Sequence, residues 1–333
     1  MGHRRQIALA LTGVMLAGCG GGGTTAEGDG AALALVAYST PQDAYEALTA
    51  AFAATEGGAG VTFSQSYGSS GDQSRAVEAG QPADVVAFSL EPDMTRLVEA
   101  ELVAGDWADD EHDGMVTESV VVLVVREGNP EGIDGWDDLI QDGIEVVTPN
   151  PFTSGGARWN VMAAYGAQLK QGRSHDEAVQ YLHDLFANVV VQDDSARKSL
   201  QTFSSGKGDV LIAYENEAIF AQQSGESLEY IVPDETILIE NPIAMTTTTE
   251  HEEQARAFVD FVHNDEGQTI FAENGYRPVV DGIDSPFDLP TPTALFEIDE
   301  FGGWDQVMAD FFDPEGSVMA DVEASIGVDP AGG

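Results

Sequence analysis

Residues 148–160 read Thr-Pro-Asn-Pro-Phe-Thr-Ser-Gly-Gly-Ala-Arg-Trp-Asn, and no other stretch says as much about the fold. An apolar, strand-like run at residues 144–147 comes before it, and a helix-like run at residues 159–170 follows. A strand, a Ser-Gly-Gly turn and a helix in this order place free backbone N–H groups at a helix N-terminus. Glycine lets a ligand approach the backbone, and the helix dipole favours negative charge there. The stretch therefore predicts an anion site at residues 154–156.

The composition is strongly acidic, which limits the partners of the chain. It holds 58 Asp and Glu against 13 Lys and Arg, for a net charge of −45, which resembles the surfaces of proteins from high-salt environments. There the Debye length falls to about 3 Å near 1 M salt, and nucleic acid and anionic membrane surfaces are poor partners. The acidic run at residues 109–113 could hold a metal ion, but similar clusters recur along the chain and favour a solvated loop. We predict no metal, no cofactor, and an anion site that works through local donors.

The chain begins with a pattern typical of a secretion signal. Two arginines precede an apolar run at residues 7–17, which has the length of a signal-peptide core and is too short to span a bilayer. The Leu-Ala-Gly-Cys sequence at residues 16–19 resembles the lipobox of bacterial lipoproteins, which implies cleavage before Cys19 and its lipidation; an incidental cysteine is the alternative. Cys19 is the only cysteine, so no disulfide forms within the chain. We predict a signal peptide over residues 1–18, a lipid anchor and Gly-rich tether over 19–31, and a protein at the outer face of the cytoplasmic membrane or in the periplasm.

Short apolar runs alternate with amphipathic helical stretches after the tether. The strand candidates include residues 33–38, 84–89 and 119–126, and the helix candidates include residues 41–54 and 250–264. This alternation predicts an α/β architecture with largely parallel sheets, and roughly 300 residues are enough for two lobes with a core each. Open α/β sheets bind ligands at the carboxyl ends of their strands. We therefore expect the chemistry in loops that lead from strands into helices.

Three further loops share the strand-to-helix geometry. They are Ser-Tyr-Gly-Ser-Ser-Gly at residues 66–71, Asp-Asp-Ser-Ala-Arg at residues 193–197, and the stretch at residues 208–217. In the last of these, a strand-like run ends at Tyr214 and places it at the carboxyl end of the strand. Each alone is weak, because a Ser or Gly turn before a helix is an ordinary N-cap. Together they match one family in order along the chain.

The chain resembles the periplasmic sulfate-binding proteins that feed ABC importers. The matching segments are residues 65–77, 127–130, 148–160, 186–203, 208–218, 267–278 and 301–304. The resemblance implies a two-lobed periplasmic-binding-protein fold of type II, in which each lobe is a mostly parallel sheet flanked by helices and the ligand lies in the hinge cleft. We predict that residues 32–118 and 242–333 form lobe 1 and that residues 119–241 form lobe 2.

The resemblance also implies which residues hold the ligand. Carried over position by position, they are Ser70, the Ser154 hydroxyl, the backbone N–H groups of Gly155 and Gly156, Ala196, and Tyr214. Neutral donors at helix N-termini can saturate the oxygens of a desolvated dianion without a counter-ion, at roughly 1.5–3 kcal/mol for each charge-assisted hydrogen bond. Arg158 and Arg197 lie just inside two of the helices, where they either support the site from behind or only brace the helix.

Three positions depart from the pattern of the family. Ser39 stands in place of Asp, Asp72 stands after Ser70 and Gly71 in place of Lys, and Tyr214 stands in place of Trp. An Asp suits the first turn of a helix, although Asp72 or Tyr214 could instead accept the proton of hydrogen phosphate. Sulfate carries no proton at neutral pH and suits a pocket of donors. We predict sulfate as the ligand, with thiosulfate, phosphate or molybdate as alternatives.

A secreted hydrolase is the alternative from another class. It would need a base within hydrogen-bond reach of Ser154 or Ser70. The five histidines after the signal peptide lie outside the motif loops, and the chain lacks Gly-x-Ser-x-Gly, His-Glu-x-x-His and Walker-type motifs. Glu215 and Glu217 match the family pattern and are predicted to be structural or hinge-closing. We predict no enzymatic activity and a monomer that serves the permease of an ABC importer; a sensor as partner stays open.

Overall fold

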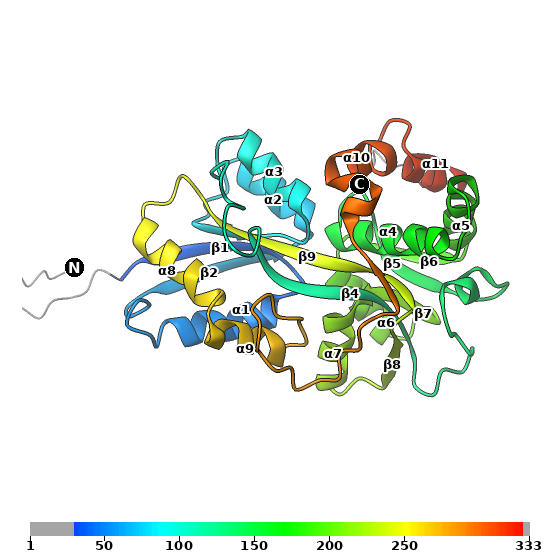
Figure 1. Ribbon diagram of the computed structural model, residues 1–333, viewed down its shortest axis with the longest axis horizontal. Helices are drawn as coiled ribbons and strands as arrows, with labels where there is room; N and C mark the ends of the chain where they lie inside the picture. The colour runs from blue at the N-terminus through cyan, green and yellow to red at the C-terminus, as the bar shows by residue number, and fades with distance from the viewer. Residues whose placement is uncertain (1–29, 329–333) are drawn as a thin grey trace, which may run out of the picture.

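The computed structural model describes residues 30–328 and is drawn in Figure 1. The strands are β1 (Ala32–Tyr38), β2 (Thr62–Gly68), β3 (Val85–Ala87), β4 (Met115–Arg126), β5 (Val146–Pro149), β6 (Val189–Asp193), β7 (Val210–Tyr214), β8 (Leu228–Ile231), β9 (Glu235–Met245) and β10 (Ala294–Phe296). The helices are α1 (Gln42–Phe52), α2 (Ser70–Glu78), α3 (Glu91–Glu99), η1 (Trp136–Ile140), α4 (Gly155–Lys170), α5 (His175–Ala187), α6 (Ala196–Ser204), α7 (Glu215–Gln223), α8 (Glu252–Val262), α9 (Asp265–Glu273), η2 (Ile298–Phe301), α10 (Gly303–Phe311) and α11 (Val318–Ser325). The predicted signal peptide and Cys19 lie outside the described residues.

The first lobe is built on a sheet with the strand order β2-β1-β3-β9. β1 runs parallel to β2 and β3, and the end of β9 joins β3 in the antiparallel direction. Alternate residues of β1 point to opposite faces, and both faces are apolar. Leu35 packs in one core with Phe52 and Phe258, while Val36 packs in another with Met94. Helices α1, α8 and α9 therefore cover one face, and α2 and α3 cover the other (Figure 1).

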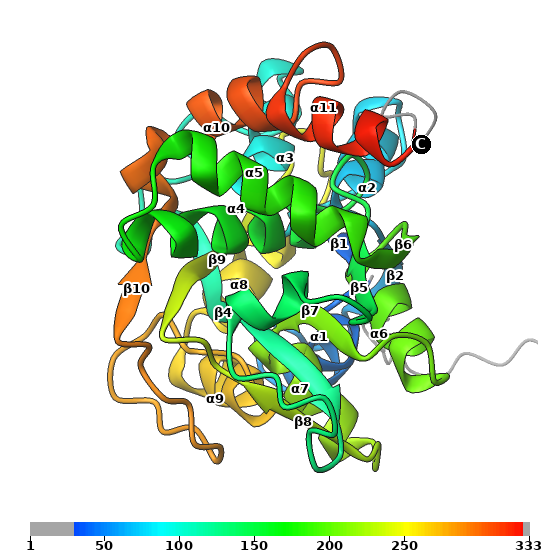
Figure 2. The same ribbon diagram turned by 90° about the vertical axis from the view of Figure 1, so that its right-hand side faces the viewer.

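The second lobe is built on a sheet in which β5 runs parallel to β6 and β7. β4 lies antiparallel to both β7 and β8. Helices α4 and α5 cover one face, and α6 and α7 cover the other (Figure 2). α4 is buried on nearly every side, because the sheet lies beneath it and further helices lie over it.

Two long strands join the lobes. The first half of β4 pairs with β9, and its second half pairs with β7. The last residues of β9 pair with β3 in the first lobe. Each of the two strands thus runs from one sheet into the other, and the chain has the predicted two-lobed type II fold.

The C-terminal segment packs on helices of the second lobe, and α10 also contacts α3 of the first lobe. Helices α10 and α11 lie over α4 and α5 (Figure 2), and the Trp304 ring meets Trp159 edge to face with centroids 4.7 Å apart. Gly166 leaves the room that the Phe296 ring needs, because a Cβ at residue 166 would lie 2.3 Å from that ring. The predicted assignment of residues 242–333 to lobe 1 stays a prediction, and this packing favours placing the last part of that range on lobe 2.

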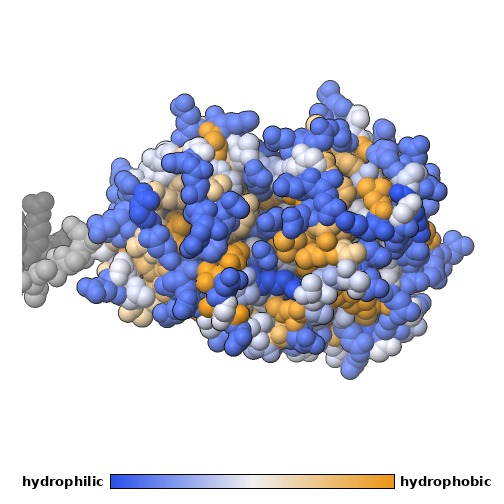
Figure 3. Space-filling view, in the orientation of Figure 1, coloured by the Kyte–Doolittle hydropathy of each residue, from blue (hydrophilic) through white to orange (hydrophobic). Residues whose placement is uncertain are grey.

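Polar residues cover most of the outside. Figure 3 shows hydrophilic residues over most of the face that Figure 1 presents, with apolar residues in separate patches. Within residues 30–328, Val190 is the one large apolar side chain that is exposed. In the same part of the chain, no helix has the length and apolar character needed to cross a membrane.

Candidate anion-binding site

The N-termini of three helices meet between the lobes. α2 follows β2, α4 follows β5 and α6 follows β6, so each helix begins near the carboxyl end of a parallel strand. Their N-cap residues are Ser69, Ser154 and Ser195, and none of these side chains accepts a hydrogen bond from its own helix. The first N–H groups of a helix have no partner within it. The three helices therefore present uncapped donors and the positive ends of their dipoles to one place.

A small buried cavity lies at this place. Its volume is about 10 Å³, which is far less than the roughly 300–1,000 Å³ typical of sites for drug-sized ligands. No charged side chain lines it and most of the lining residues carry a hydroxyl; they are Tyr38, Ser39, Thr40, Gly68, Ser69, Ser70, Ser89, Ser154, Gly156, Ser195 and Ala196. The cavity is suited to a small polar ion and not to a larger organic ligand.

The structure brings most of the predicted site residues together. Five of them line the cavity: Ser39, Ser70, Ser154, Gly156 and Ala196. Gly155 lies beside Ser89 and Leu90, and the Tyr214 hydroxyl lies 2.7 Å from the Ser89 hydroxyl. The first turns of the three helices hold the remaining predicted residues, which are Gly71, Asp72, Arg158 and Arg197. The residues that the resemblance implies thus lie together where the helices meet, but the resemblance did not separate residues that line the cavity from residues behind it.

α4 begins four residues earlier than its apolar pattern predicts. Ser154 is the extended N-cap residue, and Gly155 and Gly156 already belong to the helix. Neither glycine has a positive φ. They are therefore needed for the space around them and not for a left-handed turn.

The two glycines leave room for different neighbours. A Cβ at Gly155 would lie 2.1 Å from Leu90 Cδ2 and 2.7 Å from Ser89 Oγ, so this glycine lets α4 pack against the first lobe. A Cβ at Gly156 would lie 3.5 Å from Ser154 Oγ and 3.3 Å from Ala196 Cβ, among residues that line the cavity. Gly156 keeps the cavity open, and Gly155 keeps the lobes close.

The hydroxyl of Ser70 is already engaged. It donates to Asp93 Oδ2 at 2.6 Å and accepts from the Ser89 backbone N–H at 3.0 Å. Asp93 is fully buried and is paired with Arg96 at 3.0 Å. Ser70 can therefore offer its backbone N–H at the start of α2, while its side chain fixes the loop that carries Ser89.

Two charged residues near the site, Arg158 and Asp72, do not line the cavity. Arg158 is buried, and its Nε donates to the carbonyl of Pro151 at 3.0 Å, so it braces the loop before α4. Burial lowers the pKa of its guanidinium, and the Asp93 carboxylate opposes that shift. Burial also raises the pKa of the Asp72 carboxyl, but hydrogen bonds from Ser69 and Arg75 outweigh it and leave that pKa below its usual value.

Arg197 connects the two lobes. Its guanidinium donates to the carbonyl of Thr40 at 2.6 Å and to the Asp43 carboxylate at 2.9 Å, both in the first lobe. It also pairs with Glu217 of the second lobe at 3.0 Å, and Glu217 is buried. Arg197 thus binds groups of both lobes beside the cavity.

Ser89 is the residue that the sequence interpretation missed. It lines the cavity, and its hydroxyl lies 2.7 Å from the Tyr214 hydroxyl. Tyr214 is buried and does not line the cavity. The signal was present, because residues 84–89 were predicted to be a strand that runs into a helix, but no motif marked the Ser.

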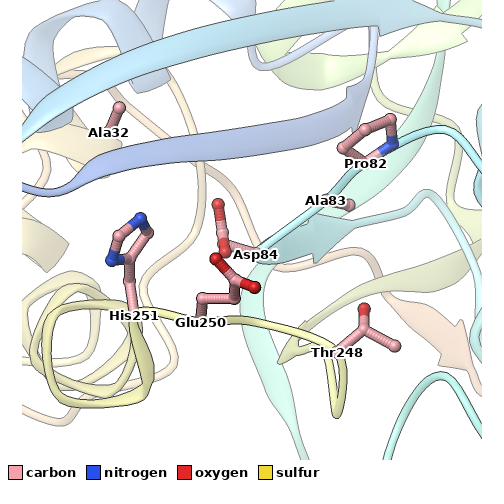
Figure 4. A pocket seen from close by; sticks show the side chains of 7 residues that line it. All are labelled: Ala32, Pro82, Ala83, Asp84, Thr248, Glu250 and His251. Carbon is pink, nitrogen blue, oxygen red and sulfur yellow. The ribbon is translucent and has the colours of Figure 1, made fainter.

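A second, larger hollow lies at the opposite end of β1 and β3 (Figure 4). Its lining includes Asp84, Glu250 and His251, and the two carboxylates would repel an anion. Within residues 30–328 no group of three or more His, Cys, Asp or Glu side chains is arranged to hold a metal ion. This hollow shares no residue with the cavity between the helices.

Two lobes that share two strands and enclose a small cavity of donors define the class of the protein, a solute-binding protein. The chain belongs to the bacterial extracellular solute-binding proteins, whose family model matches residues 33–277. It is a binding protein and not an enzyme, so the hydrolase alternative is set aside.

The comparisons with individual proteins agree with this class. A sulfate-binding protein of Synechococcus elongatus is 40% identical over 323 residues, which cover 92% of each chain. The solved structure of the sulfate-binding protein SubI from Mycobacterium tuberculosis matches with a TM-score of 0.82 and 42% identity, covering 85% of this chain and 100% of the other. A thiosulfate-binding protein of Pseudomonas aeruginosa is 34% identical and covers 83% of this chain and 88% of its own.

Glu215 forms an ion pair near the hinge strands. Its Oε2 accepts from Arg277 Nε at 2.9 Å, and its Oε1 has no partner among the described residues. Burial raises the pKa of the carboxyl to about 7, and Arg277 opposes the shift. Because the folded protein holds the proton more tightly than the unfolded chain, ionisation of Glu215 costs stability.

The raised pKa of Glu215 predicts that the stability of the protein depends on pH. Below about pH 4 the wild-type protein keeps the full contribution of protonated Glu215 and loses it as the pH rises to 7. We expect the unfolding free energy of the wild type, relative to Glu215→Gln, to fall by about 3 kcal/mol between pH 4 and 8. Urea unfolding followed by circular dichroism at several pH values measures this, with the exposed Glu253→Gln as the control. Parallel profiles for the wild type and Glu215→Gln would contradict it.

Proposed function

We propose that this protein captures sulfate outside the cytoplasmic membrane and delivers it to an ABC importer. The observation that carries the proposal is the buried cavity at the N-termini of α2, α4 and α6, which no carboxylate lines. The sulfate-binding relatives support the choice of ligand. The thiosulfate-binding relative supports thiosulfate as the second candidate.

In this proposal neutral groups hold the ion. They are the backbone N–H groups of Ser70, Gly155, Gly156 and Ala196 and the Ser154 hydroxyl, with Tyr214 supporting the site. Each charge-assisted hydrogen bond contributes roughly 1.5–3 kcal/mol, and the closed lobes strengthen it by excluding water. Arg158 and Arg197 act from behind, since their guanidinium groups are held by backbone carbonyls and carboxylates. The acidic exterior then lowers the affinity for the ion only slightly, because the bound ion is removed from water and surrounded by donors.

The same chemistry favours an ion without a proton. Hydrogen phosphate would bring an O–H group into a cavity that no carboxylate lines. A lining hydroxyl that accepts this proton no longer donates its own to the ion, and the loss of that hydrogen bond costs about 1–3 kcal/mol. Asp72, which could have accepted that proton, is held by Ser69 and Arg75 and does not line the cavity. We therefore place phosphate behind sulfate and thiosulfate.

Binding and release require the lobes to move about β4 and β9. We propose that the chain divides into lobes at these strands, and that residues 294–328 move with the second lobe because they pack on α4 and α5. The Arg197 contacts to Thr40 and Asp43 form only when the lobes are closed around the cavity. They favour the closed state of a monomer that presents its ligand to a permease.

A titration of the purified protein tests the ligand. We expect calorimetry at high salt to show one saturable site for sulfate, with phosphate at least about tenfold weaker at pH 7 because of its proton. Thiosulfate and molybdate are measured in the same series. The proposal would be contradicted if the protein bound no sulfate, or if it bound phosphate as tightly as sulfate.

Gly156→Ala tests the position of the ion. The added methyl group stands beside Ser154 and Ala196 without a severe clash, so the fold should persist while the room for the ion shrinks. We expect sulfate affinity to fall at least about tenfold, which corresponds to the loss of one hydrogen bond to the ion. Gly105→Ala is the matched control, because no atom lies within 4 Å of the added group. Unchanged affinity in Gly156→Ala would place the ion elsewhere.

The anchor is tested at Cys19, which lies outside the described residues. We propose that the chain is cut before Cys19 and held to the membrane by a lipid on that residue. We expect Cys19→Ser to move the protein from the membrane fraction to the soluble fraction of the producing cells. Wild type and variant in the same fraction would argue against a lipid anchor.

A further inference from the structure

Ser89 is held by groups from both lobes. Its backbone N–H donates to Ser70 Oγ at 3.0 Å. Its carbonyl accepts from Trp159 Nε1 and from Asn241 Nδ2, each at 2.8 Å. Three elements, α2, α4 and β9, thus fix the backbone of a residue that is 1% exposed and lines the cavity. With the lobes together, these contacts fix the backbone of Ser89 beside the cavity.

Tyr214 reaches this hydroxyl from the second lobe. The two oxygens lie 2.7 Å apart, so one hydroxyl donates to the other. Burial raises the pKa of the Tyr214 phenol far above its usual range, and hydrogen bonds with Ser89 and Asn241 oppose the shift. The phenol therefore keeps its proton at every physiological pH.

A bound anion decides the direction of this hydrogen bond. Ser89 Oγ lines the cavity and has no hydrogen-bond partner other than Tyr214 among the described residues. An oxyanion without a proton can only accept, so with such an ion in the cavity Ser89 directs its own proton to the ion. The proton between the two hydroxyls is then that of Tyr214.

We propose that the Ser89 hydroxyl donates a hydrogen bond to the bound oxyanion, and that Tyr214 acts as a positioning residue that orients it. The proposal rests on the proposed oxyanion-binding function and names a ligand group beyond the helix N-termini. It also gives the pair a role in selectivity. As long as Tyr214 donates to Ser89, the Ser89 proton is available to the ligand, and an ion that carries its own proton is disfavoured.

A double-mutant cycle with two ions tests the proposal. The variants are Ser89→Ala, Tyr214→Phe and the double variant, each titrated with sulfate and with phosphate at pH 7. We expect Ser89→Ala to lower sulfate affinity about 10- to 100-fold, the loss of one charge-assisted hydrogen bond. Tyr214→Phe frees Ser89 to accept a proton, so sulfate weakens and the ratio of sulfate to phosphate affinity narrows. The double variant should match Ser89→Ala, because the effect of Tyr214 passes through Ser89.

Two further variants control for structure. Ser89→Cys keeps the backbone bonds and nearly the shape of Ser89, but a thiol is a weak donor, so sulfate affinity should fall here too. Ser199→Ala removes another buried hydroxyl that does not line the cavity and should bind sulfate as the wild type does. Thermal unfolding of each variant identifies any that fail to fold.

Three results would overturn the proposal. Ser89→Ala and Ser89→Cys within twofold of the wild type would show that this hydroxyl does not contact the ion. The second result has two parts: the losses of sulfate affinity in the two single variants add in the double variant, and Tyr214→Phe leaves the ratio of sulfate to phosphate affinity unchanged. Together they would mean that Tyr214 contacts the ion itself. A wild-type protein that binds no oxyanion would remove the proposed function along with this inference, and it is distinguished from the first two results by the wild-type titration.

Discussion

Unsatisfied N–H groups at three converging helix N-termini are the constraint on which this structure depends. A buried donor without a partner is costly, and the capping serines leave these donors open. α2 belongs to the first lobe, and α4 and α6 belong to the second. The site is therefore complete only where the lobes meet. Gly155 allows that close approach, since any side chain there would strike Leu90.

The second theme is the separation of charge from the cavity. The chain is strongly acidic, yet no carboxylate lines the cavity. Buried carboxylates at the junction of the lobes are paired instead, Glu217 with Arg197 and Glu215 with Arg277. Breaking such a pair leaves a buried charge without compensation, so Arg197 and Arg277 stabilise the junction of the lobes. The acidity belongs to the outer surface, and the donors belong to the interior.

Much of the fold was predictable because it follows from local patterns. Strands that alternate with helices indicate an α/β fold, and the block at residues 148–160 identifies its family. The limits of the elements were less accurate: α4 starts at Gly155, because glycines that look like a turn can also enter a helix when packing demands it. The assignment of residues 242–333 to lobe 1 stays a prediction, and the packing of Trp304 on Trp159 of α4 was not foreseen. No local pattern encodes a contact between residues so far apart in the chain.

The sequence by itself determined that loops carrying Ser and Gly lead from strands into helices, since capping and dipoles are properties of a few neighbouring residues. It thereby predicted an anion site at residues 154–156. Only the tertiary structure decided which hydroxyls remain available. The Ser70 side chain is taken up by Asp93, and Tyr214 stands behind Ser89. The reason is physical: a hydroxyl has one proton, and its direction depends on partners that the fold brings from distant parts of the chain.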